Sequence, residues 1–144
     1  MPVEAFIDTN VLVYSVSSHP PEREKREIAR AVIASTDFGI SAQVLAEFYV
    51  TVTKKISQPL SDEHALQLLE PLTRLPVITV DSDLVLEAIA MKRAHRISYW
   101  DGAIVAAAHR LGAPIIFSED LSDGQSYGST KVVNPFRTRK RTNQ

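Results

Sequence analysis

Apolar and polar residues occur along this chain in blocks that predict strands alternating with helices. Short apolar runs that end at a polar turn are typical of buried strands, and longer stretches with apolar residues three and four apart are typical of helices. Strands separated by helices favour a parallel sheet that is covered on both faces. The strands are expected at residues 3–7, 38–41, 77–81, 114–118 and 131–133. The helices are expected at residues 10–17, 22–35, 41–55, 61–75, 82–96 and 98–112.

No linker or repeat interrupts this pattern, so residues 1–136 are expected to form one domain. A basic tail at 137–144 follows, which we expect to be poorly ordered. Of the 144 residues 44% are hydrophobic and 23% charged, which is ordinary globular usage. The sequence has neither a basic leader nor an apolar run of membrane length, which predicts a cytoplasmic protein that does not bind the membrane. The lack of cysteine agrees with that compartment and excludes thiolate metal sites.

Acidic residues follow two of the predicted strands. Asp8 comes directly after the first strand, and Asp120 lies in the SEDL stretch after the fourth. In an open parallel sheet, ligands bind beyond the carboxyl ends of the strands. A single aspartate in such a place is most simply a helix cap or a turn residue. Two strand ends with the same feature favour a shared site.

Two further acids lie within predicted helices. At about 100° per residue, Asp101 shares a helix side with the apolar Ile104, Val105 and Ala108, so it is expected to face inward. The alternative is a cap near the first helical turn that is stabilised by the helix dipole. Glu47 lies at the margin of an apolar stripe, a position that is easily solvated, and by itself it is a weak candidate.

Inward carboxylates without histidine or cysteine partners are typical of sites for hard divalent cations, Mg²⁺ or Mn²⁺. Without a cation, the carboxylates would repel one another at short range. Metal-assisted hydrolysis of a phosphodiester is the chemistry that uses such a site. The four histidines show no ligand spacing and are expected at the surface or as outer groups. Trp100 is expected in the core, although a tryptophan beside an acid could also stack on a base.

The net charge of −1 argues against a nucleic-acid partner, but the distribution of basic residues weakens that argument. Basic residues gather at 54–55, 92–96 and 137–141. Each run by itself is most simply a solvated helix face or a tail.

With Asp8, Glu47, Asp101 and Asp120 in this order, the chain resembles the PIN-domain ribonucleases, and in particular the VapC toxins of type II toxin–antitoxin pairs. The matching stretches are FIDTNVLVY, SAQVLAEFY, SYWDGAIVAAA, and SEDLSDGQSYG followed by VVNPF. Together they span residues 6–136.

This resemblance implies a three-layer α/β/α domain with strand order 3-2-1-4-5, a homodimer, and metal-dependent endoribonuclease activity on a structured RNA such as tRNA or rRNA. It implies an antitoxin partner that places a basic side chain in the acidic site. Asp8, Asp101 and Asp120 resemble direct ligands of Mg²⁺ or Mn²⁺, and Glu47 a ligand of a second ion or the group that positions the water. The groups expected to orient these ligands are Asn10, Ser118 and Asp123. The residues expected to contact RNA are Arg137, Arg139, Lys140 and Arg141.

Three other functions are compatible with parts of the sequence. A catalytically silent RNA- or protein-binding module would lack one of the acids, and none is missing. A structure-specific DNA nuclease could share the metal site, but such enzymes carry added elements for which the chain leaves little room. A phosphatase with an aspartyl nucleophile needs a second aspartate at position 10, where Asn10 stands.

Overall fold

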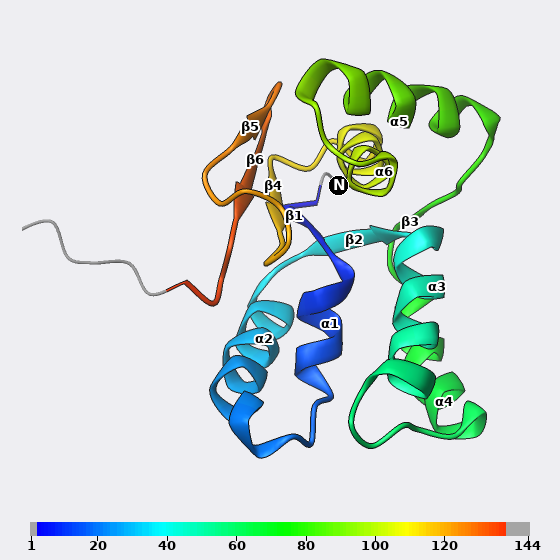
Figure 1. Ribbon diagram of the computed structural model, residues 1–144, viewed down its shortest axis with the longest axis vertical. Helices are drawn as coiled ribbons and strands as arrows, with labels where there is room; N and C mark the ends of the chain where they lie inside the picture. Colours follow the sequence, from blue (N-terminus) through cyan, green and yellow to red (C-terminus); the bar gives the residue numbers. More distant parts are fainter. Residues whose placement is uncertain (1–2, 138–144) are drawn as a thin grey trace, which may run out of the picture.

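The computed structural model describes residues 3–137, in which a six-stranded sheet lies between two layers of helices (Figure 1). The strand order is β3-β2-β1-β4-β6-β5, and all neighbours are parallel except β5 and β6. The predicted order 3-2-1-4-5 is confirmed, with the KVV segment as the fifth parallel strand. The strands are β1 (Ala5–Ile7), β2 (Phe38–Ser41), β3 (Val77–Ile78), β4 (Ile115–Phe117), β5 (Ser126–Tyr127) and β6 (Thr130–Val133).

The helices of residues 3–137 divide between the two faces of this sheet (Figure 1). One face carries α1 to α4, and α5 and α6 pack together on the other. None of these helices is both long and apolar enough to cross a membrane. The helices are α1 (Thr9–Ser15), α2 (Arg23–Ser35), α3 (Ala42–Val50), α4 (Asp62–Leu72), α5 (Ser82–His95) and α6 (Tyr99–Leu111).

The central strands β1 and β4 determine where Asp8 and Ser118 lie. The three residues of β1 are fully buried because helices cover both faces of the sheet. Ile7 pairs with Phe117 of β4, and the Asp8 amide donates to the Phe117 carbonyl at 2.9 Å. The carboxyl ends of β1 and β4 are therefore level, and Asp8 and Ser118 leave the sheet side by side.

Several element boundaries differ from the sequence-based expectation. The strand expected at 77–81 is only two residues long, and Asp81 instead caps α5, where it accepts the Leu84 amide at 2.8 Å. The first helix begins one residue early, at Thr9, with Asp8 as its cap. The third expected helix changes from α to a π turn at Thr51–Lys55. The short antiparallel strand β5 was not predicted.

Small residues allow α5 and α6 to approach closely. Gly102 of α6 faces the backbone of α5, where an added Cβ would lie 2.5 Å from the Ala88 carbonyl oxygen. Ala88, Ala103 and Ala106 are buried in the same contact. Helix α6 ends as expected at Gly112, whose φ of 74° is a conformation that glycine adopts without strain.

Substituting Gly102→Ala is expected to lower the free energy of unfolding by about 1–3 kcal/mol, because the methyl group would force α5 and α6 apart. Helix propensity alone favours the opposite sign, by up to about 1 kcal/mol. Urea denaturation of both proteins measures the difference, and a variant at least as stable as the wild type would contradict the close contact.

Candidate active site

A cavity of about 910 Å³ opens beyond the carboxyl ends of the parallel strands. Its lining comes mainly from α1, α3 and α6 and from the segment after β4, and the remaining residues are Glu22, Thr51, Lys55 and Val80. Asp8, Glu47, Asp101 and Asp120 all line it. The structure therefore brings together four acids that lie far apart in the sequence, and their individual chemical roles remain predictions.

Asp8 is the most buried of the four acids, with 5% of its surface exposed. Its Oδ1 accepts the Thr9 amide at 2.8 Å, and its Oδ2 accepts the Ser118 hydroxyl at 2.8 Å. Burial raises its pKa to about 6, against the opposing effect of these two donors, and the charges of Asp120 and Glu47 add to the rise. Asp8 is thus the cap of α1 and also lines the cavity, so a capping role and a place in the shared site are compatible.

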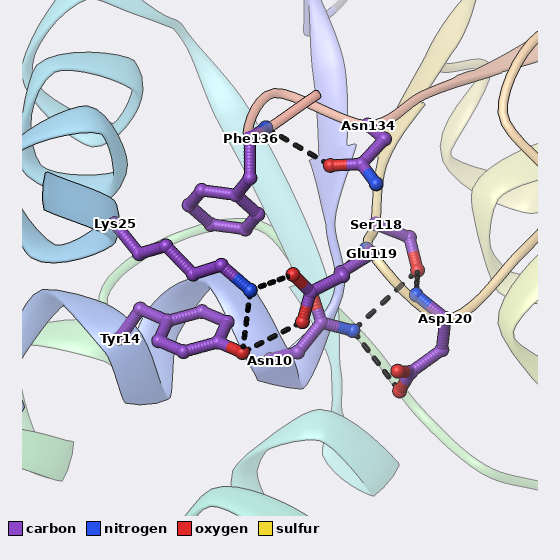
Figure 2. Close-up of polar contacts among 8 residues, drawn as sticks. All are labelled: Asn10, Tyr14, Lys25, Ser118, Glu119, Asp120, Asn134 and Phe136. Carbon is purple, nitrogen blue, oxygen red and sulfur yellow. Dashed lines mark hydrogen bonds and ion pairs between the residues drawn. The ribbon is translucent and has the colours of Figure 1, made fainter. Parts of the chain in front are cut away.

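Asn10 lies between two of the acids. Its Nδ2 donates to Asp120 Oδ2 at 3.2 Å and lies 3.4 Å from Asp8 Oδ2. Ser118 contacts the same pair, because its Oγ accepts the Asp120 amide at 3.1 Å and donates to Asp8. The orienting contacts expected of Asn10 and Ser118 are present, and Figure 2 shows those to Asp120.

Glu47 is held by two neighbours. Thr9 donates its hydroxyl to Oε1 at 2.8 Å, and Gln43, one turn earlier on α3, donates to Oε2 at 3.3 Å. Glu47 is half-buried rather than freely solvated, which its position at the margin of the apolar stripe did not indicate. The i,i+4 spacing of Gln43 and Glu47 is the feature of the sequence that could have indicated the contact between these two side chains.

Asp101 lies in the first turn of α6 but does not cap it. Ser98 is the cap, and its Oγ accepts the Asp101 amide at 3.0 Å. Burial is the main cause that raises the pKa of the Asp101 carboxyl, and the charges of Asp120 and Glu47 raise it further. Asp8 and Asp101 are therefore both repelled by the charges of Asp120 and Glu47.

Three expectations require correction or stay open. Asp123 does not line the cavity; its carboxylate accepts the Asn134 amide at 2.9 Å and contacts Arg137 at 3.4 Å, and its orienting role stays a prediction. The core position expected for Trp100 is wrong, because 61% of it is exposed at the cavity. Of the basic tail, Arg137 is exposed and pairs with Asp123. Arg139, Lys140 and Arg141 lie outside the described residues.

Sequence reasoning missed the partners of Glu119. This residue lines the cavity beside Asp120, but its carboxylate pairs with Lys25 of α2 and accepts the Tyr14 hydroxyl at 2.7 Å. The hydrogen bond to Glu119 is the main cause that raises the pKa of Lys25. Lys25 and Glu119 are 94 positions apart, and no periodic pattern connects them.

The donor chemistry of the cavity fits a hard divalent cation, because four carboxylates supply oxygen ligands only. Within residues 3–137, however, no three histidine, cysteine or acidic side chains are gathered into a group that could hold an ion. None of the four histidines lines the cavity. The fit therefore rests on the kind of ligand and not on the present spacing.

The family model of the PIN domain matches residues 5–122. The chain therefore belongs to the PIN domain family. No curated protein matches the chain.

Solved structures with the same fold share low sequence identity with this chain. A toxin–antitoxin complex from Klebsiella pneumoniae is 18% identical, with a TM-score of 0.66, and the match covers 93% of this chain and 99% of that one. The Mycobacterium tuberculosis toxin VapC20 is 17% identical, with a TM-score of 0.64 and coverage of 81% and 89%. FitAcB from Neisseria gonorrhoeae is 21% identical, with a TM-score of 0.61 and coverage of 93% and 99%. At these identities the likeness establishes the fold alone.

The raised pKa of Asp8 predicts a stability that falls as the pH rises. Between its ordinary value of 3.8 and about 6, the folded state binds more protons than the unfolded state, so this contribution is lost on going to neutral pH. One pKa unit corresponds to about 1.4 kcal/mol, which gives a loss of about 3 kcal/mol. Asp8→Asn is expected to remove this dependence. Chemical unfolding of both proteins from pH about 4 to 7.5 measures it, and parallel curves would contradict the raised pKa.

Proposed function

We propose that this protein is a metal-dependent endoribonuclease and the toxin of a VapBC-type toxin–antitoxin pair. The observation that carries the proposal is the convergence of Asp8, Glu47, Asp101 and Asp120 on one cavity of a PIN domain. Support for the toxin assignment comes from the structural neighbours, which include toxin–antitoxin complexes and a toxin described as cleaving the sarcin–ricin loop. The substrate class is a structured RNA such as tRNA or rRNA.

In this proposal Asp8, Asp101 and Asp120 are the ligands of Mg²⁺ or Mn²⁺, and Glu47 positions the attacking water or binds a second ion. A divalent cation at such a site activates water and neutralises the phosphate. The protein contributes the orientation of its carboxylates. Glu47 is held by Thr9 and Gln43, which keeps its carboxylate turned toward the cavity.

The partners follow from the same assignment. An antitoxin would neutralise the acidic cavity with a basic side chain, which the mutual repulsion of the carboxylates favours. We further propose a homodimer in the cytoplasm, with residues 1–136 as one domain. These three points rest on the family resemblance.

The first test is the cleavage of total cellular RNA by purified protein that is free of antitoxin. Discrete fragments are expected with Mn²⁺, and none with EDTA or with Asp101→Asn, because both changes remove cation binding at the cavity. Sequencing of the fragment ends would identify the substrate.

The matched control is Asp83→Asn. Asp83 lies in the first turn of α5, as Asp101 does in α6, but it is exposed and does not line the cavity. This variant should cleave at the wild-type rate. Cleavage that persists in EDTA or in Asp101→Asn would contradict the metal-dependent mechanism, and no cleavage by any folded protein would favour a binding module without catalysis.

Neutralising Arg137, Arg139, Lys140 and Arg141 together is expected to weaken RNA binding and to flatten its salt dependence. At roughly 0.7 in log–log slope per lost phosphate contact, the slope should fall by up to about 3. Filter binding or fluorescence anisotropy at several salt concentrations measures it. An unchanged slope would exclude the tail from the RNA contact.

A further inference from the structure

Helix α1 contacts Glu119 at two successive turns (Figure 2). The Oδ1 of Asn10 accepts the Glu119 amide at 3.0 Å, and the Tyr14 hydroxyl donates to Glu119 Oε1 at 2.7 Å. Residues four apart lie on the same side of a helix, so one face of α1 binds both the backbone and the side chain of this residue. Lys25 of α2 pairs with the other carboxylate oxygen.

Aromatic side chains shield this ion pair. The Lys25 ammonium lies 4.8 Å from the centre of the Tyr14 ring and 5.7 Å from that of Phe136, and the two rings meet edge to face at 4.9 Å. The amide of Phe136 donates to Asn134 Oδ1 at 2.9 Å, which fixes the turn that presents the Phe136 ring (Figure 2). The Glu119 side chain is only 25% exposed as a result.

Anchoring Glu119 also anchors its neighbour in the acidic cavity. Asp120 accepts from Asn10 Nδ2 at 3.2 Å, and the amides of Asp120 and Leu121 donate to Ser118 Oγ at 3.1 and 3.2 Å. The segment 118–121 is thus held at Asp120 by Asn10 and by the hydroxyl of its own Ser118, and at Glu119 by Lys25 and Tyr14.

We propose that Lys25 and Tyr14 are positioning residues, which hold Glu119 so that Asp120 is turned toward the cation expected in the cavity. This inference rests on the proposed function. Lys25 has a second effect, because Glu119 also lines the cavity. Because its carboxylate is engaged by Lys25 and Tyr14, Glu119 is kept from acting as a fifth carboxylate ligand of the cation.

The contribution of the ion pair to global stability should be small. The Lys25 side chain is 40% exposed, and pairs that are open to water add little to the free energy of unfolding. Its effect is expected instead in the local order of segment 118–121 and in the affinity of the cavity for a cation, where outer groups commonly change affinity 10- to 100-fold, as a rough range.

The test uses Trp100, the single tryptophan of the chain, as a reporter in the cavity. Mn²⁺ is expected to quench its fluorescence in the full-length wild-type protein. Lys25→Met keeps most of the apolar stem but removes the charge, and Tyr14→Phe removes only the hydroxyl. We expect Mn²⁺ to bind about tenfold more weakly to Lys25→Met, and more weakly also to Tyr14→Phe.

The control is Arg74→Met, which removes an exposed ion pair with Glu70 outside the cavity lining and should bind Mn²⁺ as the wild type does. Tighter binding by Lys25→Met would mean that the released Glu119 acts as an additional ligand, and would overturn the positioning role. Unchanged binding in both variants would overturn it as well.

Amide hydrogen exchange separates this inference from the proposed function. If Mn²⁺ does not quench the wild type, the metal-dependent function fails. The positioning role is then decided by the amides of Glu119, Asp120 and Leu121, which should exchange faster in Lys25→Met and Tyr14→Phe at an unchanged thermal midpoint. Exchange at the wild-type rate would overturn the positioning role.

Discussion

The structure depends on the level ends of two neighbouring parallel strands, β1 and β4. Because Ile7 and Phe117 are paired, the next residue of each strand leaves the sheet at the same height, and the Ser118 hydroxyl meets the Asp8 carboxylate. A buried carboxylate costs free energy unless it is hydrogen-bonded. Here the second donor is the Thr9 amide, which is available because α1 begins directly after the strand. The burial of Asp8 and the start of α1 therefore depend on each other, because the same hydrogen bond satisfies the buried carboxylate and caps the helix.

That arrangement leaves Asp8 in an electrostatically unfavourable environment. Hydrogen bonds from Ser118 and Thr9 do not fully offset the burial of Asp8, and the charges of Asp120 and Glu47 add to its raised pKa. A protein under selection for stability alone would not gather these charges. Functional sites are where such local conflicts occur and are offset elsewhere, here by a sheet and helices with an apolar core. The repulsion is an electrostatic reason to expect a cationic ligand.

Sequence reasoning predicted most of the elements and the shared site of Asp8, Asp101 and Asp120, because strand ends and helix faces can be read from the pattern of apolar residues, whereas Glu47 was assigned through the family resemblance. It failed where no repeating pattern of residues signals a contact or an exposed position. Trp100 lies beside Asp101 in the first turn of α6, where it lines the cavity and is exposed. The pairing of Lys25 with Glu119 joins two distant charged residues that each look solvated in sequence. The apolar run at 77–81 also overstated the strand, because β3 ends at Ile78 and Asp81 belongs to the cap of α5.

The seven-residue helix α1 shows how a marginal element becomes rigid. Isolated helices of this length are unstable in water, so its order must come from its neighbours. Val11 and Leu12 pack into the core, while Thr9, Asn10 and Tyr14 bind α3 and the segment after β4. The polar residues that hold the helix are the same ones that orient the acids. A change at Thr9 or Asn10 is therefore expected to alter the site and the helix together.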